Sequence, residues 1–149
     1  MPVSRALRRL LRIRDLEEEQ CRIALESAQG ELNRLHGALA ATTGRERRGR
    51  RIFEESARSG ELADRFSGLE ETRAAERIAS LLATRIETSR EDVDRLREEF
   101  LAKRVELRQA ETLIKEAEAA DSVEAARKAQ LALDDWYRTR LHARGERFP

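Results

Sequence analysis

Leucine and other apolar residues recur along both halves of the chain at alternating spacings of four and three. This heptad spacing is typical of helices that pair as coiled coils. In the first half the spacing runs through Leu7, Leu11, Arg14, Glu18, Cys21, Leu25, Ala28, Leu32, Leu35 and Leu39. In the second half it runs through Leu82, Ile86, Ser89, Val93, Leu96, Phe100, Lys103, Leu107, Ala110, Ile114 and Ala117. We call these positions the seam. They predict an all-α protein with two long helical arms, over about residues 4–58 and 62–120.

Glycines mark the expected turn between the arms. Gly44, Gly49, Gly60 and Gly68 fall in the region where the leucine pattern fades. Glycine destabilises a helix interior because it loses more backbone entropy than any other residue. The sequence Ser59-Gly60-Glu61 reads as a helix stop and restart, with Ser59 as the cap of the second helix. We therefore expect the turn at about residues 59–61.

Folding back at this turn brings the two halves of the seam together in an antiparallel coiled-coil hairpin. In one register, partners have residue numbers that sum to 121, so Leu39 meets Leu82 and every seam position of the first half meets a seam position of the second half. The seam Glu18 then faces the seam Lys103, which spares both charges from burial without a partner. A two-helix hairpin buries little apolar area for its length, so we expect frayed ends that become ordered on a partner.

The same register leaves residues 121–149 as a tail beyond the first residues of the chain, roughly 40 Å long if helical. Asp121 and Glu124 belong to a stretch that resembles a capping box, so a kink or break is an alternative to a continuous helix. Trp136 and Tyr137 have little to pack on there. Large aromatic residues of this kind are typical interface anchors.

The amino-acid composition limits which classes of partner and which cellular locations are expected for this chain. Charged residues make up 40% of the chain, yet the net charge is only +1, so no overall field favours nucleic acid or an anionic membrane. The arginine-rich stretch over residues 45–51 is interpreted as a solvated helix face, with nucleic-acid binding kept as a weaker hypothesis. No apolar run is long enough to cross a membrane, and no signal-peptide core is present. We expect a cytosolic protein without nucleic-acid partners.

Residues for catalysis or metal binding are few. Cys21 is the single cysteine, so no internal disulfide or thiolate zinc cluster can form. His36 and His142 are isolated in the sequence, and a two-helix hairpin offers no deep pocket. The sequence therefore predicts no enzyme, no cofactor and no metal.

Each end of the hairpin carries a candidate binding surface. At the end with both termini, Arg5, Arg8, Arg9, Arg12 and Arg14 form a basic group that could enter an acidic ring. The alternative is neutralisation by the nearby Asp15, Glu17, Glu18 and Glu19.

At the turn, several large apolar residues do not fit the seam: Ile52, Phe53, Leu62, Phe66 and Leu69. They form either a local cluster or an exposed apolar patch for a partner.

Three stretches of the sequence resemble the flagellar export protein FliJ family, which is related to the YscO-like stalk proteins of type III secretion. They are Leu7-x-x-Leu10-Leu11-x-Ile13-Arg14 followed by Glu17-Glu18-Glu19, then Ser59-Gly60-Glu61-Leu62 with Phe66 and Leu69, and finally Leu131-x-Leu133-Asp134-Asp135. The resemblance covers nearly the whole chain. The sequence departs from the family near Leu62, where an aromatic residue is usual three or four positions before Phe66.

The resemblance implies a non-enzymatic stalk that sits in the pore of a hexameric export ATPase, contacts the membrane export gate and escorts export chaperones. It implies a cytoplasmic protein at the inner membrane of the flagellar base, monomeric on its own. Carried onto this sequence, the ATPase contact is Arg5, Arg8, Arg12, Trp136, Tyr137, Arg138 and Arg140, and the gate contact is Leu62, Phe66 and Leu69. The alternatives are a YscO-like stalk of a virulence secretion system and a homodimeric coiled-coil scaffold.

Overall fold

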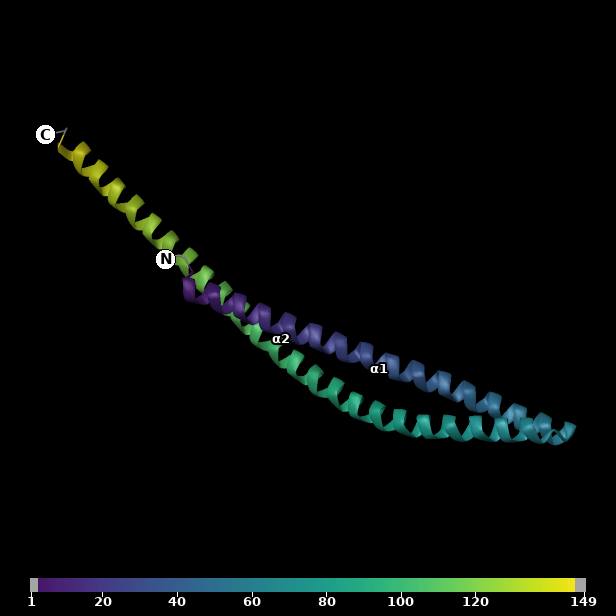
Figure 1. Ribbon diagram of the computed structural model, residues 1–149. Helices are drawn as coiled ribbons and strands as arrows, with labels where there is room; N and C mark the ends of the chain where they lie inside the picture. Colours follow the sequence, from purple (N-terminus) through teal and green to yellow (C-terminus); the bar gives the residue numbers. More distant parts are fainter. Residues whose placement is uncertain (1–2, 147–149) are drawn as a thin grey trace. The chain divides into compact units, whose positions relative to one another are not determined.

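The computed structural model describes residues 3–146, which form two α-helices. Helix α1 spans Arg5–Ser59 and helix α2 spans Leu62–Glu146. The two helices pack side by side and antiparallel (Figure 1), and no strand occurs within residues 3–146. The structure confirms the predicted all-α helical hairpin.

The turn is short because one glycine reverses the chain. Gly60 has a φ of 76°, in the left-handed region that glycine adopts without a steric penalty. Its N–H donates a hydrogen bond of 2.8 Å to the carbonyl of Ser56, which caps the end of α1. The loop is therefore Gly60–Glu61, inside the predicted turn region. Ser59 is the last residue of α1 and not the cap of α2, because Glu61 supplies the carbonyl that accepts from the N–H of Arg65 at 3.2 Å.

The chain divides into two compact units, which we describe separately. The turn-bearing unit comprises residues 19–102. The terminal unit comprises residues 1–18 and 103–149, of which the structure describes 3–18 and 103–146.

In the turn-bearing unit, large aliphatic side chains hold the helices together over one stretch, which we call the leucine segment. Leu35, Leu82 and Ile86 form a buried cluster, and Leu32 and Leu39 pack against it. This grouping matches the predicted register, in which Leu39 meets Leu82 and Leu35 meets Ile86. Each buried side chain of this size contributes about 1.5–3 kcal/mol of hydrophobic stabilisation.

Nearer the turn, the buried positions are small, and we call this stretch the small-residue segment. On α1, Thr42, Gly49 and Ser56 are buried at steps of seven residues after Leu35. On α2, Gly68 and Ala75 are buried at the same steps before Leu82. The prediction that the heptad pattern decays here is wrong, because the period continues with residues too small to be recognised as apolar anchors.

The glycines of this segment are required by the close approach of the two backbones. A Cβ added to Gly68 would lie 2.7 Å from the backbone N of Phe53 and 2.8 Å from the carbonyl O of Gly49. A Cβ added to Gly49 would lie 2.6 Å from Oγ1 of Thr72 and 3.0 Å from the carbonyl O of Gly68. Within this segment, the glycines are therefore sites of tight helix packing. Of the four glycines that marked the expected turn region, Gly60 lies in the loop, whereas Gly49 and Gly68 lie inside the helices.

Buried hydroxyls in the small-residue segment are satisfied within their own helices. Thr42 donates to the carbonyl of Ala38 at 2.8 Å, and Ser56 donates to the carbonyl of Phe53 at 2.7 Å. Among the described residues, no buried side-chain polar atom lacks a hydrogen-bond partner. The segment thus avoids the free-energy cost of an unpaired buried polar group.

The terminal unit has a paired part and an unpaired part. In the paired part, Leu7 and Leu11 of α1 are half-buried and Ala110 of α2 is buried. Beyond it, α2 continues alone, and every side chain over residues 122–145 is exposed. Figure 1 shows this tail, in green and yellow, extending past the start of α1.

The break considered at Asp121 does not occur, because α2 is continuous from Leu62 to Glu146. The surrounding residues are rich in alanine, the strongest helix former, and no glycine or proline interrupts them. Met1, whose position opposite residue 120 the register implies, and residues 147–149 at the end of the tail lie outside the described residues.

Candidate binding surfaces

The seam residues lie where the helices meet, within each unit. None of the seam positions over residues 7–39 and 82–117 is exposed. Buried or half-buried seam residues therefore include Leu25, Leu32, Leu35, Leu39, Leu82, Ile86, Val93, Leu96, Phe100, Leu107 and Ile114. These side chains stabilise the hairpin, and partner binding must use other residues.

A ring of charges interrupts the seam in the terminal unit. The guanidinium of Arg14 lies 3.1 Å from Glu17 on its own helix and 2.9 Å from Glu106 on α2. The ammonium of Lys103 lies 3.3 Å from each of the same two carboxylates. Glu17 and Glu106 therefore each form salt bridges with both Arg14 and Lys103. The predicted partner of Lys103 was Glu18, and that prediction is wrong by one residue, because the half-buried Glu17 reaches across to α2.

These contacts shift the ionisation of the ring. The hydrogen bond from Arg14, followed by that from Lys103, holds the pKa of Glu17 below its ordinary value. Hydrogen bonds to Glu106 and Glu17 raise the pKa of Lys103. The lowered pKa of Glu17 and the raised pKa of Lys103 both favour the charged forms, so these two side chains form an ionic link between the helices.

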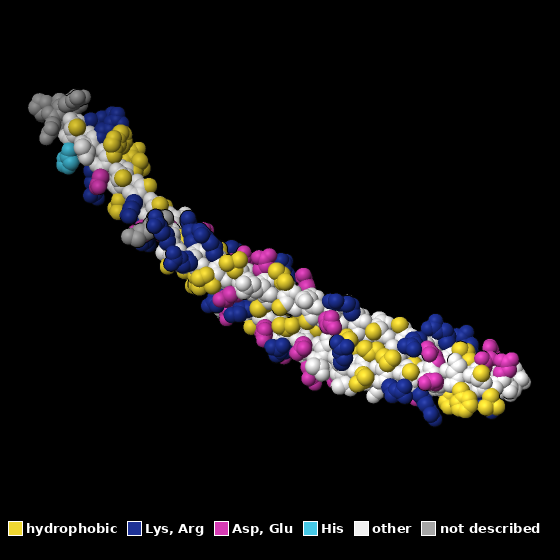
Figure 2. Space-filling model, viewed as in Figure 1, with side chains coloured by type: hydrophobic (Ala, Val, Ile, Leu, Met, Phe, Trp, Pro, Cys, Tyr) yellow, Lys and Arg dark blue, Asp and Glu magenta, His cyan; other side chains and the backbone are white. Residues whose placement is uncertain are grey.

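The start of α1 presents a basic surface. Arg5, Arg8, Arg9 and Arg12 are exposed and together line a shallow hollow with Ala6. Figure 2 shows the dark-blue side chains gathered where α1 begins. Within residues 3–146, no carboxylate lies within 4.0 Å of any of these four guanidinium groups. We call these four residues the arginine face.

Nearby acids do not form ion pairs with the arginine face. Glu17 is engaged by Arg14 and Lys103, and Glu19 pairs with Arg22 at 3.5 Å. Asp15 is exposed, Glu18 is half-buried, and neither forms a salt bridge among the described residues. Of the neutralisation considered from the sequence, the pair of Arg14 with Glu17 is formed, whereas none of the four acids pairs with the arginine face among the described residues. The positive charge of the arginine face is therefore available to a partner.

The tail of α2 carries a group of exposed aromatic and basic side chains. Trp136 and Tyr137 are 51% and 55% exposed, with ring centroids 5.2 Å apart in an edge-to-face arrangement. The guanidinium of Arg140 lies 4.8 Å from the centroid of Trp136, within cation–π range. Arg138 is exposed beside them. These contacts preorganise the indole ring while leaving half of it uncovered.

The predicted ATPase-contact residues form two separate groups. The ionic ring fixes Arg14 opposite Glu106, so Arg5 lies opposite about residue 115 in the same antiparallel pairing. Trp136 is then about 30 Å further along α2, given the helical rise of 1.5 Å per residue. A partner that contacts both groups must therefore extend along the tail.

Next to the turn, two large side chains of the predicted gate contact are uncovered. Leu62 and Phe66 are 67% and 65% exposed, whereas Leu69 is half-buried. Phe53 of α1 is more covered, and the guanidinium of Arg65 lies 5.9 Å from the centroid of its ring. The sequence left two alternatives for these residues, a local cluster or an exposed patch. Leu69 is packed locally, whereas Leu62 and Phe66 form an exposed apolar patch.

Other candidate chemistry finds little support among the described residues. They contain no group of three or more His, Cys, Asp or Glu side chains that could hold a metal ion. His36 and His142 are exposed, and Cys21 is half-buried in the seam. No described helix is long and apolar enough to pass through a lipid bilayer.

The arginine-rich stretch over residues 45–51 is partly paired. Arg45 binds Glu71 of α2 at 2.9 Å, and Arg50 binds Glu46 at 2.6 Å. Arg48 is exposed and has no salt bridge among the described residues. Part of this stretch therefore stabilises the helix pair, in line with its interpretation as a solvated helix face.

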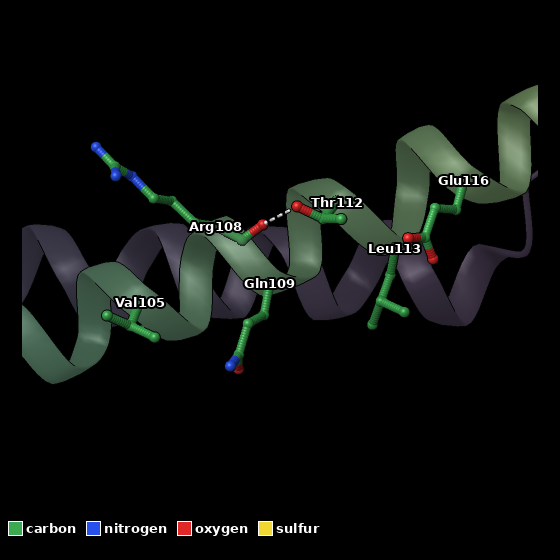
Figure 3. A pocket seen from close by; sticks show the side chains of 6 residues that line it. All are labelled: Val105, Arg108, Gln109, Thr112, Leu113 and Glu116. Atoms are coloured by element: carbon green, nitrogen blue, oxygen red, sulfur yellow. Dashed lines mark hydrogen bonds between the residues drawn. The ribbon is translucent and has the colours of Figure 1, made fainter.

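Two surfaces were not identified from the sequence. One is a shallow hollow on the outer side of α2, where Val105, Gln109 and Leu113 project to the same side and Arg108 projects away (Figure 3). The other is the outer side of α1, where Ile13 and Leu16 are exposed. Both could have been found by testing each helix for a second heptad pattern after the seam was assigned.

The fold and these surfaces define a class of protein: a two-helix coiled-coil hairpin whose exposed apolar and basic groups are suited to binding other proteins. The sequence profile of the flagellar FliJ protein matches residues 4–147, and the chain belongs to the FliJ family. It is therefore a flagellar export-related component, from a family whose members are non-catalytic. No curated protein and no solved structure matches the chain.

Proposed function

We propose that this protein is a non-enzymatic stalk of the flagellar export apparatus, which binds the hexameric export ATPase and the membrane export gate and assists export chaperones. The observation that carries the proposal is the family match over residues 4–147. As part of the proposal, the protein works in the cytoplasm, peripherally associated with the inner membrane at the flagellar base. The exposed surfaces then supply candidate contacts for each partner.

The ATPase contact is proposed to use the terminal unit. The guanidinium groups of Arg5, Arg8 and Arg12, to which no carboxylate within residues 3–146 binds, supply positive charge for an acidic ring surface. Trp136, held by Arg140 and half exposed, supplies an aromatic anchor of the kind that dominates interface energies. A stalk that binds through both features would stay attached when either is weakened, since the contacts are separate.

The gate contact is proposed to use Leu62, Phe66 and Leu69 beside the turn. The exposure of Leu62 and Phe66 supports it, because large apolar side chains uncovered on a soluble surface favour partner contacts. Leu69 is half-buried and would contribute mainly by positioning Phe66.

Two alternatives receive less support. The matching profile is that of a flagellar protein, which favours the flagellar over the virulence-type system. A homodimeric scaffold would need the seam for a second chain, yet within each unit the seam positions are already covered by the other helix of the same chain. We therefore favour a chain that is monomeric on its own.

The test is the ATP hydrolysis rate of the cognate export ATPase with and without this protein. The wild-type chain should bind the ATPase and raise the rate. Trp136→Ala should weaken binding about tenfold or more, because loss of an interface anchor costs 1–2 kcal/mol or above. Val123→Ala, a truncation at a similarly exposed tail position, is the matched control and should leave binding unchanged.

Absence of both binding and stimulation by the wild-type chain would exclude the ATPase role.

For the gate, binding of the gate's cytoplasmic domain should fall with Phe66→Ala and persist with Leu81→Ala, where the leucine is 68% exposed on the same helix. Equal effects of these two substitutions would exclude the turn residues as the contact.

A further inference from the structure

Helix α1 carries a second heptad stripe, on the side that faces away from α2. In the terminal unit the seam side of α1 is formed by Leu7, Leu11, Arg14 and Glu18, all half-buried. The opposite side contains Ala6, Arg9, Ile13 and Leu16, which follow one another at spacings of three, four and three. All four are exposed. We call them the outer stripe.

The spacing of the outer stripe is that of a coiled-coil contact and not of scattered surface apolar residues. Positions that alternate by three and four lie along one line of a helix and insert between the side chains of a facing helix. Ile13 and Leu16 are 45% and 58% exposed, and neither is covered by α2. A helix with seams on two opposite sides is suited to pack between two other helices.

The charges around the stripe are energetically unfavourable without a partner. The N-terminus of a helix bears a partial positive charge, which favours acidic side chains in the first turn. Helix α1 has no acid in its first turn and instead begins with Arg5, followed by Arg8, Arg9 and Arg12. Because no carboxylate within residues 3–146 binds these four groups, an acidic partner would lower their mutual repulsion beyond the screening that water and salt provide.

We propose that the outer stripe and the arginine face together bind an amphipathic helix of a partner protein, with an apolar seam against Ala6, Ile13 and Leu16 and carboxylates against the arginines. The proposal rests on the proposed function for its biological setting, since three of these arginines belong to the predicted ATPase contact. It adds the shape and chemistry of the bound element.

A protein helix fits this surface better than an anionic lipid bilayer. Helices that bind a bilayer surface present a broad apolar face. The outer stripe is narrow, because its apolar members are Ala6, Ile13 and Leu16, with Arg9 among them. A facing helix can pack against such a narrow stripe and place acidic side chains opposite Arg9 and Arg12.

The experiment uses the full chain and a fluorescein-labelled, lactam-stapled peptide of about 18 residues, since shorter unstapled helices are marginal in water. The peptide has leucine at its seam positions and glutamate beside them. A second peptide has lysine in place of each glutamate. Fluorescence anisotropy at physiological salt should show the glutamate peptide binding at least tenfold more tightly than the lysine peptide.

Variants locate the binding surface. Leu16→Gln should weaken binding of the glutamate peptide at least tenfold, whereas Leu113→Gln, the same substitution at a similarly exposed position on the outer side of α2, should leave it unchanged. The double charge reversal R9E and R12E should reverse the preference, so that the lysine peptide binds more tightly. Circular dichroism checks that each variant remains as helical as the wild type.

Several results would overturn the proposal. They are no binding of the glutamate peptide, equal binding of both peptides, an equal effect of the two leucine substitutions, or binding to phosphatidylglycerol vesicles without binding to the peptide. Peptide binding without ATPase stimulation would leave this proposal standing and remove the ATPase role. ATPase stimulation without peptide binding would leave the ATPase role standing and remove this proposal.

Discussion

The leucine segment and the small-residue segment belong to the same unit, lie on the same two helices and share one heptad period, yet they hold the helices together in different ways. In the first, large side chains such as Leu35 and Ile86 fill the space between the helices. In the second, Gly49 and Gly68 let the backbones meet directly. The period determines which side faces the partner, and side-chain size determines how close the partner lies.

The change from large to small residues follows from the tight turn. The loop contains only Gly60 and Glu61, so the two helices must lie close together where they leave it. Large side chains at Gly49 or Gly68 would force the backbones apart beside a connection that is too short to allow it. Further from the turn this restraint weakens, and Leu35 and Leu82 can occupy the seam.

Removing a large side chain should have the largest effect, and it should be confined to the leucine segment. Leu35→Ala leaves a cavity next to Leu82 and Ile86, and buried leucine truncations cost about 2–4 kcal/mol of unfolding free energy. The measurement is urea denaturation followed by circular dichroism. Leu81→Ala, at an exposed position on α2 next to the buried Leu82, is the control and should change stability by less than about 0.5 kcal/mol.

Equal losses in Leu35→Ala and Leu81→Ala would mean that the helix pair does not close around the cluster. The expected difference therefore tests the hairpin itself, before any question about its partners.

Adding a single methyl group should have opposite effects in the two segments. Gly68→Ala places a Cβ within 3 Å of backbone atoms of α1, so it should destabilise the protein by about 1–3 kcal/mol. Gly37→Ala in the leucine segment meets no atom within 4 Å and removes a helix-destabilising glycine, so it should stabilise the protein by about 0.5–1 kcal/mol. The same denaturation assay measures both.

A stabilising Gly68→Ala would show that the helices are not in close contact near the turn. Because both substitutions add the same methyl group to a helix interior, intrinsic helix propensity cannot account for a difference in sign.

The contrast between the segments also explains what the sequence could predict. The leucine segment and the turn were predictable, because leucine spacing marks a seam and Gly60 marks a chain reversal. The continuation of the seam through Gly49 and Gly68 was not. Glycine carries no side chain that signals burial, and its usual effect in a helix is destabilising. Only the position of the facing backbone distinguishes a packed glycine from a flexible one.

The binding surfaces were predictable in part for a similar reason. Residues that do not fit the seam, such as Phe66 and Trp136, stood out by sequence and are exposed in the structure. The pairing of Lys103 with Glu17 could not be derived, because long charged side chains reach over more than one residue position. The absence of ion pairs to the arginine face among the described residues likewise depended on where each nearby acid points.

The smallest predicted effect concerns the ion pair that spans the helices in the small-residue segment. The hydrogen bond from Arg45 lowers the pKa of Glu71, so the pair contributes stability above the carboxyl's ordinary pKa of 4.5 and loses it as the pH falls through the lowered value. Stability of the wild type should therefore decrease more between pH 6 and about pH 3 than that of Glu71→Gln.

Glu70→Gln, which removes an exposed carboxylate without an ion pair among the described residues, should retain the wild-type decrease. Leu35→Ala should retain it too, since no described ion pair spans the helices in the leucine segment. A Glu71→Gln variant with the full wild-type pH dependence would show that the close approach near the turn rests on backbone packing alone.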